Sequence, residues 1–410
     1  MVSHQVPLIR FAVSASMALV SGCGSNSVAI HGSSPSSPAT TATGGASTST
    51  TAGASPLFAV LETRRAGAQG NQTHDTVAIA NSQGYAVAKA SFTPRSVPQQ
   101  FDAATVMQPE AYLAAGAVYY SDGGGVVRRL DQSGKVATVA SFPLTSPEQE
   151  LSIAVSPDGS QLMAARLTFP KLIGNTQPPT ATGNWILEIM KSPAGGKTTL
   201  VQHWQAGSDS YPGSPGGFTT IFVVGWDSKG PIGLIGAKVG TQQGSFHGQR
   251  FFGGRLAYLG LDGRPGVSIG GSDCEPFASP AAGGVICATN SGAEVTASVR
   301  GLDGRAKWKG AFPLPRSACA IGGGFALSPD GNQLATDGQI VTLATSATVP
   351  LPTPFTPVAW LGSNDLIGTG FKQTADSPCG DETLGIVHLS PRPSLENWAF
   401  SGQVVGVVLP

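Results

Sequence analysis

A short turn motif occurs twice in this chain and limits the folds that are open to it. The segments 153–164 and 325–336 both run from an apolar stretch through Ser-Pro-Asp-Gly into a second stretch that begins Gln-Leu. Proline sets φ at the second turn position, aspartate is tolerated at the third, and glycine adopts the positive φ that closes a hairpin. One such turn carries little information, but two with matching flanks indicate repeated hairpins of one kind.

The two segments resemble the Ser-Pro-Asp-Gly repeats of bacterial WD-like β-propellers, including the periplasmic propeller of the Tol system and prolyl oligopeptidase propeller domains. The resemblance is local, because only these two segments carry the full motif. It implies an all-β fold in which each repeat belongs to one blade. Asp158 and Asp330 would then occupy the same place in two different blades.

Degenerate turns of the same kind recur along the chain. The segments 130–134, 261–263 and 302–304 resemble outer hairpins of further blades, and 226–227 and 360–368 resemble inner turns. We therefore expect a single β-propeller of seven blades, with six or eight as alternatives, in the domain 56–410. The landmarks divide it into units of propeller length, near 57–92, 112–142, 150–204, 219–270, 277–312, 323–350 and 357–408.

The two ends of this domain are both apolar, at 57–61 and 404–408. Because an open ring would expose unpaired sheet edges, we expect these two segments to pair and close it. No segment shows a long apolar period of 3.6 residues, which argues against a helical solenoid or an α/β sheet. A pair of β-sandwiches is the structural alternative.

The amino terminus is typical of an exported protein. Arg10 precedes an apolar stretch, 11–20, that is shorter than the roughly 20 residues needed to span a bilayer. The residues Val20-Ser21-Gly22-Cys23 resemble the bacterial lipobox. The resemblance implies a lipoprotein signal peptide at 1–22, lipid on Cys23, and a chain anchored to a cell membrane on its extracytoplasmic side. The alternative is an ordinary secretory signal with an accidental cysteine.

Residues 23–55 are rich in Ser, Thr, Ala, Gly and Pro, and this composition predicts a flexible tether after the lipidated cysteine. The whole chain has 24 basic and 24 acidic residues, so it has no basic excess for binding nucleic acid or anionic lipid. Its 55 glycines and 31 prolines separate short apolar runs, which favours an all-β domain with many turns. We expect that domain to be monomeric.

Four cysteines remain once Cys23 carries lipid, and an even number in an oxidising compartment predicts disulfides. Three pairings are possible, and we favour Cys274 with Cys287 and Cys319 with Cys379. A metal site is the rival interpretation. It has little support, because neither C-x-x-C nor H-x₃₋₅-H spacing occurs.

The sequence predicts no catalytic residue, metal site or cofactor. The segment 270–274 fails the G-x-S-x-G pattern at its last position, and 194–199 lacks the first glycine of a phosphate loop and is better explained as an outer hairpin. Glu148 and Glu150 could share a strand face, but a solvated strand edge explains them equally well. The domain histidines have no zinc-site spacing, which favours surface or packing roles for His74, His203, His247 and His388.

Three long interruptions exceed ordinary connections, at 169–184, 205–218 and 240–254. Long loops on a rigid scaffold often carry binding residues, although variable decoration is an alternative. Aromatic and polar side chains within these interruptions are the ligand-binding candidates: Tyr211, Phe246, His247 and Arg250.

These features together favour a membrane-tethered propeller that binds an envelope protein or a small-molecule or glycan ligand, without catalysis. Two alternatives remain: a propeller-fold hydrolase or lactonase with its site at the central channel, and a structural component of an envelope assembly. Metal ligands along the channel would favour the enzyme, whereas a bare apolar face would favour binding or structure. Fold alone does not decide, because propellers serve many functions.

Overall fold

The structure is a computed structural model. Contacts group Ala54–Pro410 into one compact unit. The structure describes residues 56–66, 71–94, 111–173, 180–207, 219–236, 254–277, 280–281, 283–290, 294–313, 324–352, 355–374, 377–398 and 402–408.

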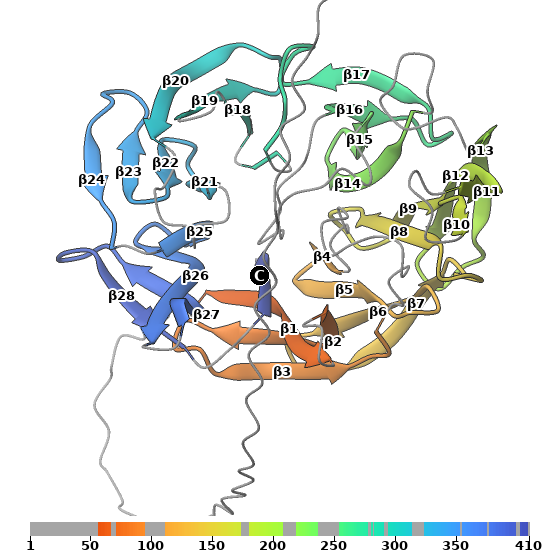
Figure 1. Cartoon of the computed structure of the whole chain (residues 1–410), viewed down its shortest axis with the longest axis horizontal. Helices are drawn as coiled ribbons and strands as arrows, with labels where there is room; N and C mark the ends of the chain where they lie inside the picture. Colours follow the sequence, from red (N-terminus) through yellow and green to blue (C-terminus); the bar gives the residue numbers. More distant parts are fainter. Residues whose placement is uncertain are drawn as a thin grey trace, which may run out of the picture. The chain divides into compact units, whose positions relative to one another are not determined.

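Within these residues the strands form seven sheets arranged as a ring, together with a separate two-stranded hairpin (Figure 1). Six of the seven sheets contain four strands, and the remaining sheet contains three. Every neighbouring pair within a sheet is antiparallel, and successive strands run outward from the centre of the ring. This arrangement confirms the predicted propeller of seven blades. It excludes the alternatives of six or eight blades and of paired sandwiches.

The first four blades contain the following strands, ordered from the innermost outward. Blade 1 contains β29 (Gly402–Val408), β1 (Leu57–Ala66), β2 (Asn71–Asn81) and β3 (Ala86–Ser91). Blade 2 contains β4 (Ala111–Ala114), β5 (Ala117–Ser121), β6 (Val126–Asp131) and β7 (Val136–Ser141). Blade 3 contains β8 (Gln149–Val155), β9 (Gln161–Thr168), β12 (Asn184–Pro193) and β13 (Thr199–Gly207). Blade 4 contains β14 (Ile221–Asp227), β15 (Gly230–Ile235), β16 (Arg255–Leu259) and β17 (Pro265–Ile269).

The last three blades complete the ring. Blade 5 contains β18 (Gly284–Asn290), β19 (Glu294–Gly301) and β20 (Ala306–Pro313). Blade 6 contains β21 (Phe325–Leu327), β22 (Gln333–Thr336), β23 (Gln339–Thr342) and β24 (Thr348–Pro350). Blade 7 contains β25 (Phe355–Leu361), β26 (Asp365–Thr374), β27 (Ser377–His388) and β28 (Ser394–Asn397). The separate hairpin between β9 and β12 consists of β10 (Lys171–Ile173) and β11 (Thr180–Thr182).

The ring closes between the two ends of the folded chain, as the sequence predicts. β29 pairs with β1, with Leu57 opposite Val408 and Leu61 opposite Gln403. β29 is therefore the innermost strand of blade 1. It does not belong to the last unit near 357–408, as its position in the sequence suggests, because blade 7 is already complete with β28.

The two Ser-Pro-Asp-Gly turns have the same geometry in different blades. In the β8–β9 turn, the Ser156 hydroxyl donates to Asp158 Oδ1 at 2.5 Å and accepts from the Gln161 N–H at 2.9 Å. The β21–β22 turn repeats both distances with Ser328, Asp330 and Gln333. The hydrogen bond from the Ser156 hydroxyl, followed by those from the Ser160 N–H and hydroxyl, lowers the pKa of Asp158 to about 2. The predicted equivalence of the two turns is confirmed.

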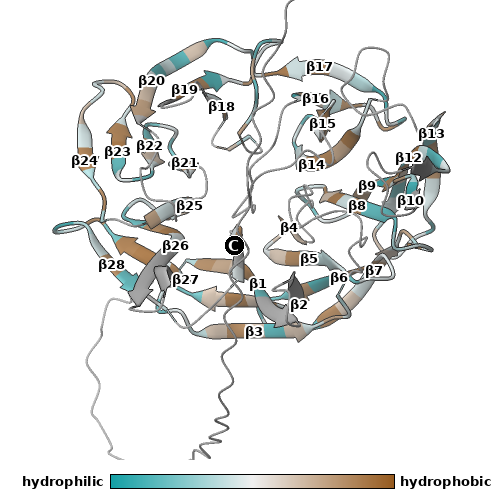
Figure 2. Cartoon of the chain, in the orientation of Figure 1, coloured by the Kyte–Doolittle hydropathy of each residue, from teal (hydrophilic) through white to brown (hydrophobic). Residues whose placement is uncertain are grey.

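The cores lie between neighbouring blades, because successive side chains of a strand point to opposite faces of its sheet. In β1, Phe58 and Val60 pack with side chains of blade 7. Ala59 and Leu61, which alternate with them, pack with side chains of blade 2. Inner strands such as β5 and β14 are accordingly buried on both faces, and Figure 2 shows apolar stretches in strands around the ring.

The antiparallel meander gives the ring two distinct faces. Turns between first and second strands, and between third and fourth strands, lie at one end of each blade, which we name the hairpin face. Links between second and third strands, and links between blades, lie at the other end, which we name the connection face. Gly123 N–H donates to the Thr93 carbonyl at 2.8 Å, which joins the connection ends of blades 1 and 2. Gly159 and Ala115 bring together the hairpin ends of blades 3 and 2.

Candidate functional site

The long interruptions belong to the connection face of blades 3 and 4. They link β9 to β12, β13 to β14, and β15 to β16. The first contains the β10–β11 hairpin, and the second starts later than expected, because β13 continues to Gly207. Tyr211, Phe246, His247 and Arg250 all lie outside the described residues, so their role as ligand-binding candidates stays a prediction.

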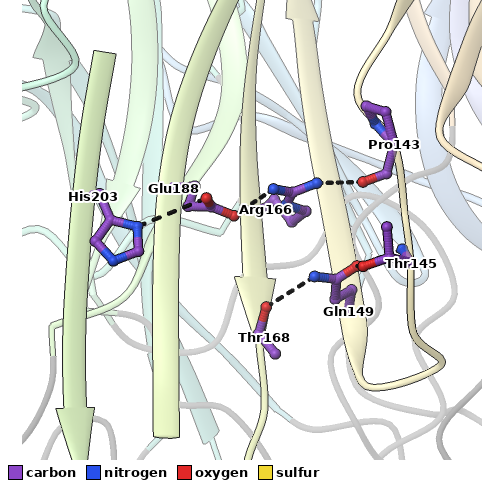
Figure 3. Close-up of polar contacts among 7 residues, drawn as sticks. All are labelled: Pro143, Thr145, Gln149, Arg166, Thr168, Glu188 and His203. Atoms are coloured by element: carbon purple, nitrogen blue, oxygen red, sulfur yellow. Dashed lines mark hydrogen bonds and ion pairs between the residues drawn. The ribbon is translucent and has the colours of Figure 1, made fainter. Parts of the chain in front are cut away.

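A row of polar side chains crosses blade 3 from its second strand to its outermost strand. Arg166 on β9 is directly opposite Glu188 on β12, and Glu188 is directly opposite His203 on β13. Figure 3 shows the three side chains in line across the strands. The register of the sheet therefore brings together three residues that are far apart in the sequence.

Arg166 and Glu188 form the centre of this row. The Arg166 Nε and Nη2 atoms lie 2.8 and 2.6 Å from Glu188 Oε2, and Nη1 donates to the Pro143 carbonyl. Their side chains are only 17% and 15% exposed. A charge buried to this extent is costly unless it is paired, so the ion pair fixes both side chains. The hydrogen bond from Arg166 to Pro143 joins blade 3 to the link from blade 2.

His203 forms the outer end of the row. Its Nδ1 atom lies 3.7 Å from Glu188 Oε1, and its side chain is 46% exposed. The imidazole therefore lies beside a carboxylate that Arg166 already holds, beyond hydrogen-bond distance of it, while much of the ring faces solvent. It could donate to or accept from a polar ligand.

A second polar group, Gln149 and Thr168, lies beside Arg166 (Figure 3). Gln149 Nε2 donates to Thr168 Oγ1 at 3.2 Å, and Gln149 Oε1 accepts from the Thr145 N–H at 2.7 Å. Gln149 begins β8 and Thr168 ends β9, so both lie at the connection end of blade 3. The polar cluster, which we define as Gln149, Thr168, Arg166, Glu188 and His203, thus runs radially across the blade beside the long links.

The acidic pair Glu148 and Glu150 does not form a solvated strand edge. Glu150 is 3% exposed within β8, whereas Glu148 is half-buried in the link before it. The Ser146 hydroxyl donates to Glu148 Oε2 at 2.6 Å, and this hydrogen bond lowers the pKa of Glu148. The solvated interpretation is therefore wrong for Glu150, because β8 is an innermost strand covered by its neighbours.

One of the two predicted disulfides is present. Cys274 and Cys287 are bonded with an S–S distance of 1.98 Å. Beside them, residues 275–277 replace a regular first strand of blade 5: the Phe277 N–H donates to the Ile286 carbonyl at 2.8 Å. Cys319 and the Cys379 side chain lie outside the described part of the chain, so their pairing stays a prediction.

The other sequence candidates have structural roles or are not described. His388 lies between Asp365 and Glu396 on blade 7, with Nδ1 2.9 Å from Asp365 Oδ1. The segment 194–198 is the β12–β13 turn, as expected of an outer hairpin. The His74 side chain is not described. Among the described residues, no three His, Cys, Asp or Glu side chains are grouped to hold a metal ion.

Sequence reasoning missed Arg166 and Glu188. Each is a single charge within an apolar strand, in Leu-Met-Ala-Ala-Arg-Leu and in Trp-Ile-Leu-Glu-Ile-Met. A charge at such a position indicates a buried partner, because an unpaired one would be costly. That pattern could have identified both residues, although not their pairing.

Comparisons with known proteins give fold-level likeness. No protein-family model and no curated protein matches the chain. Among solved structures, an oligogalacturonate lyase in complex with manganese is 10% identical, with 84% of this chain and 91% of that chain covered and a TM-score of 0.40. TolB from Acinetobacter baumannii is 13% identical, with coverages of 86% and 83% and a TM-score of 0.29.

A third similar structure is dipeptidyl peptidase 4 from Porphyromonas gingivalis, which is 9% identical with a TM-score of 0.40. The match covers 82% of this chain and 50% of that chain. At these identities and scores, the assignment of the fold rests on the strand order of this chain itself. The region that the structure describes contains no helix of the length and apolar character needed to cross a membrane. The chain is a seven-bladed β-propeller of the all-β class.

Proposed function

We propose that this protein is a membrane-tethered binding module outside the cytoplasm, anchored through lipid on Cys23. Its connection face at blades 3 and 4 would recognise an envelope protein or a small polar ligand such as a glycan. The observation that carries this proposal is the position of the polar cluster. Gln149 and Thr168 lie at the end of blade 3 where two of the three long links leave the sheet. The row of Arg166, Glu188 and His203 crosses the blade two residues from Thr168 along β9.

Three features support a binding role for that face. The closed ring is a rigid scaffold, and loops on rigid scaffolds commonly carry recognition. His203 lies beside the buried Arg166–Glu188 pair and is 46% exposed on the outermost strand of blade 3, so it offers a polar group to a ligand. The third long link leaves blade 4 on the same face, so the ligand-binding candidates Tyr211, Phe246, His247 and Arg250 all belong to links of one face.

The anchor is tested by metabolic labelling with a palmitate analogue in bacterial cells that produce the full chain. The wild type should be labelled and Cys23→Ala should not, because the thiol is the lipid acceptor in the lipobox that 20–23 resembles. Equal labelling of the two chains would contradict the lipoprotein proposal. Two or three acyl chains hold a domain firmly, since each buried methylene contributes about 0.8 kcal/mol.

The binding face is tested by chemical cross-linking in intact cells, with the cross-linked positions of this chain identified by mass spectrometry. A fourfold alanine variant at Tyr211, Phe246, His247 and Arg250 should lose the cross-links to a partner. A matched variant at exposed turn residues of the opposite face should keep them: Gln83, Gln132, Arg305 and Arg392. Loss in both variants, or in neither, would contradict a partner on the connection face.

A further inference from the structure

Exposed large apolar side chains are concentrated on the rim of the ring. Among the described residues, every one lies in the outermost strand of a blade or in the turn that leads into it: Tyr85, Val87, Val136, Leu200, Leu261, Val267 and Val349. Val267 and Tyr85 are the most exposed, at 75% and 72%. Side chains with this exposure contribute little to the core of the isolated domain.

Four of these side chains occupy consecutive blades at the hairpin face. Tyr85, Val136, Leu200 and Leu261 each lie in, or at most two residues after, the turn between the third and fourth strands of blades 1 to 4. Contacts join neighbouring blades here: the Lys191 ammonium on β12 donates to the Leu261 carbonyl in the β16–β17 turn at 3.3 Å, and the Gly195 N–H in the β12–β13 turn donates to the Val139 carbonyl on β7 at 2.7 Å. The four blades thus present an apolar arc, which we define by Tyr85, Val136, Leu200 and Leu261.

Acidic and basic side chains are mixed at these turns. Asp131 Oδ2 lies 3.7 Å from Arg129 Nη1, and Asp262 Oδ2 lies 3.8 Å from Arg264 Nε. A partner that binds through electrostatic attraction would need a surface potential of one sign, and these turns do not provide one. The arc is therefore suited to an apolar or amphipathic surface of either charge.

The chain enters the ring at this same face. β1 begins at Leu57, opposite Asn81, and Asn81 opens the turn that contains Tyr85. A tether composed like residues 24–55 has a root-mean-square span of about 30 Å. A lipid on Cys23 would hold the arc near the bilayer at an effective concentration on the order of millimolar, so even a weak surface contact would form.

We infer that the hairpin face of blades 1 to 4 rests on the bilayer surface, with the apolar arc at the headgroup boundary. The connection face then points away from the membrane, toward its partner. The inference rests on the proposed lipid anchor. It adds an orientation that the anchor alone does not impose, because a flexible tether would allow either face to approach.

Lysine reactivity measures this orientation. Purified acylated protein is reconstituted on phosphatidylcholine vesicles and treated with an amine reagent that does not cross membranes. Lys135 and Lys197 lie exposed in the turns of blades 2 and 3, whereas Lys171 lies exposed on β10 at the connection end. We expect Lys135 and Lys197 to react several-fold more slowly relative to Lys171 than they do in Cys23→Ala protein mixed with the same vesicles.

Two variants make the test specific. The double variant Leu200→Ser and Leu261→Ser should stay on the vesicles through its lipid but lose the protection of Lys135 and Lys197. The matched variant Val349→Ser, in blade 6 outside the arc, should keep it. Both sets of side chains are exposed, so neither variant removes core packing. Protection should be the same on neutral and anionic vesicles and at low and high salt.

Several results would overturn the inference. Vesicle-bound protein with the same lysine ratios as the Cys23→Ala protein would show that no face is preferred, while the anchor itself would stand. Selective protection of Lys171 would show the reverse orientation. Protection that appears only at high protein density would show contact between copies of the chain. If the wild type does not bind vesicles at all, the anchor and the orientation both fail.

Discussion

The Tyr112 hydroxyl accepts a hydrogen bond from the backbone N–H of Trp226 at a distance of 2.8 Å, although the two residues belong to blades that are not neighbours. Tyr112 lies on β4 of blade 2 and Trp226 on β14 of blade 4, so the contact passes the innermost strand of blade 3. It ties three successive blades together on the inner side of the ring.

The substitution Tyr112→Phe should reduce the free energy of unfolding by about 1–3 kcal/mol, because it leaves a part-buried N–H without its acceptor. Urea denaturation measures the change, with Tyr85→Phe as the control, since Tyr85 is 72% exposed. Equal stability of Tyr112→Phe and the wild type would contradict a tie across blade 3.

The same hydroxyl should make the fold sensitive to alkali. Burial raises the pKa of Tyr112 to about 12, and the charge of Asp227 adds to this effect. The unfolded chain then loses the proton first, so this contribution is fully present below about pH 10 and is lost as the pH rises toward 12. Tyr112→Phe should show a smaller fall in stability over that range in denaturation curves recorded at several pH values.

The disulfide should matter most for blade 5. It closes a loop with a sequence separation of 13 and secures 275–277, which stand in for a full strand. Replacing both cysteines with alanine should cost roughly 3 kcal/mol in the chain-entropy account of disulfides. Thermal melts of the double variant and the wild type test this. An unchanged melting temperature would show that the hydrogen bonds of 275–277 suffice by themselves.

The oxidation state of all four domain cysteines is a separate prediction. Titration of the denatured, purified protein with a thiol reagent should find no free thiol at Cys274, Cys287, Cys319 or Cys379. Two reactive thiols would contradict the pairing of Cys319 with Cys379 and leave the observed disulfide intact.

Much of the fold follows from local chemistry that a single sequence displays. The turns at Asp158 and Asp330 are specified by adjacent residues, and the pairing of 57–61 with 404–408 follows from the need to cover sheet edges. The contacts of Arg166 with Glu188, and of Tyr112 with Trp226, depend on register and on the order of blades in space. Those relations are set by the assembled ring, so no local pattern predicts them.

His388 should make stability depend weakly on pH near neutrality. The hydrogen bond to Asp365 raises the pKa of His388, and Glu396 adds to this effect. The protonated form is thus favoured in the fold, so its contribution is fully present below about pH 6.5 and is lost as the pH rises through the raised pKa. Because the imidazole is 37% exposed, solvent screening keeps the effect below about 1 kcal/mol. His388→Gln should flatten the pH profile of urea midpoints, and a profile identical to the wild type would contradict this role.

The ring closure should be the most sensitive part of the fold to truncation. β29 contributes the innermost strand of blade 1 and buries Val404, Val405 and Val408 at exposures of 2%, 6% and 4%. Removing residues 402–410 would expose their partners and leave an edge of β1 unpaired. A fully buried valine contributes about 1.5–3 kcal/mol. The three valines together therefore contribute an amount comparable to the whole free energy of unfolding of an ordinary domain, which is about 5–15 kcal/mol.

We therefore expect the truncated chain to melt at a much lower temperature than the wild type, or to fail to fold. Circular dichroism during heating measures this, and deletion of residues 24–55, which precede the described strands, is the matched control that should leave the melt unchanged. Adding the peptide 402–410 in excess should partly restore the melt, because the vacant edge of β1 offers the same backbone pairing. If the truncated chain melts like the wild type, or if the control deletion is equally destabilising, the pairing of β29 with β1 does not hold the ring closed.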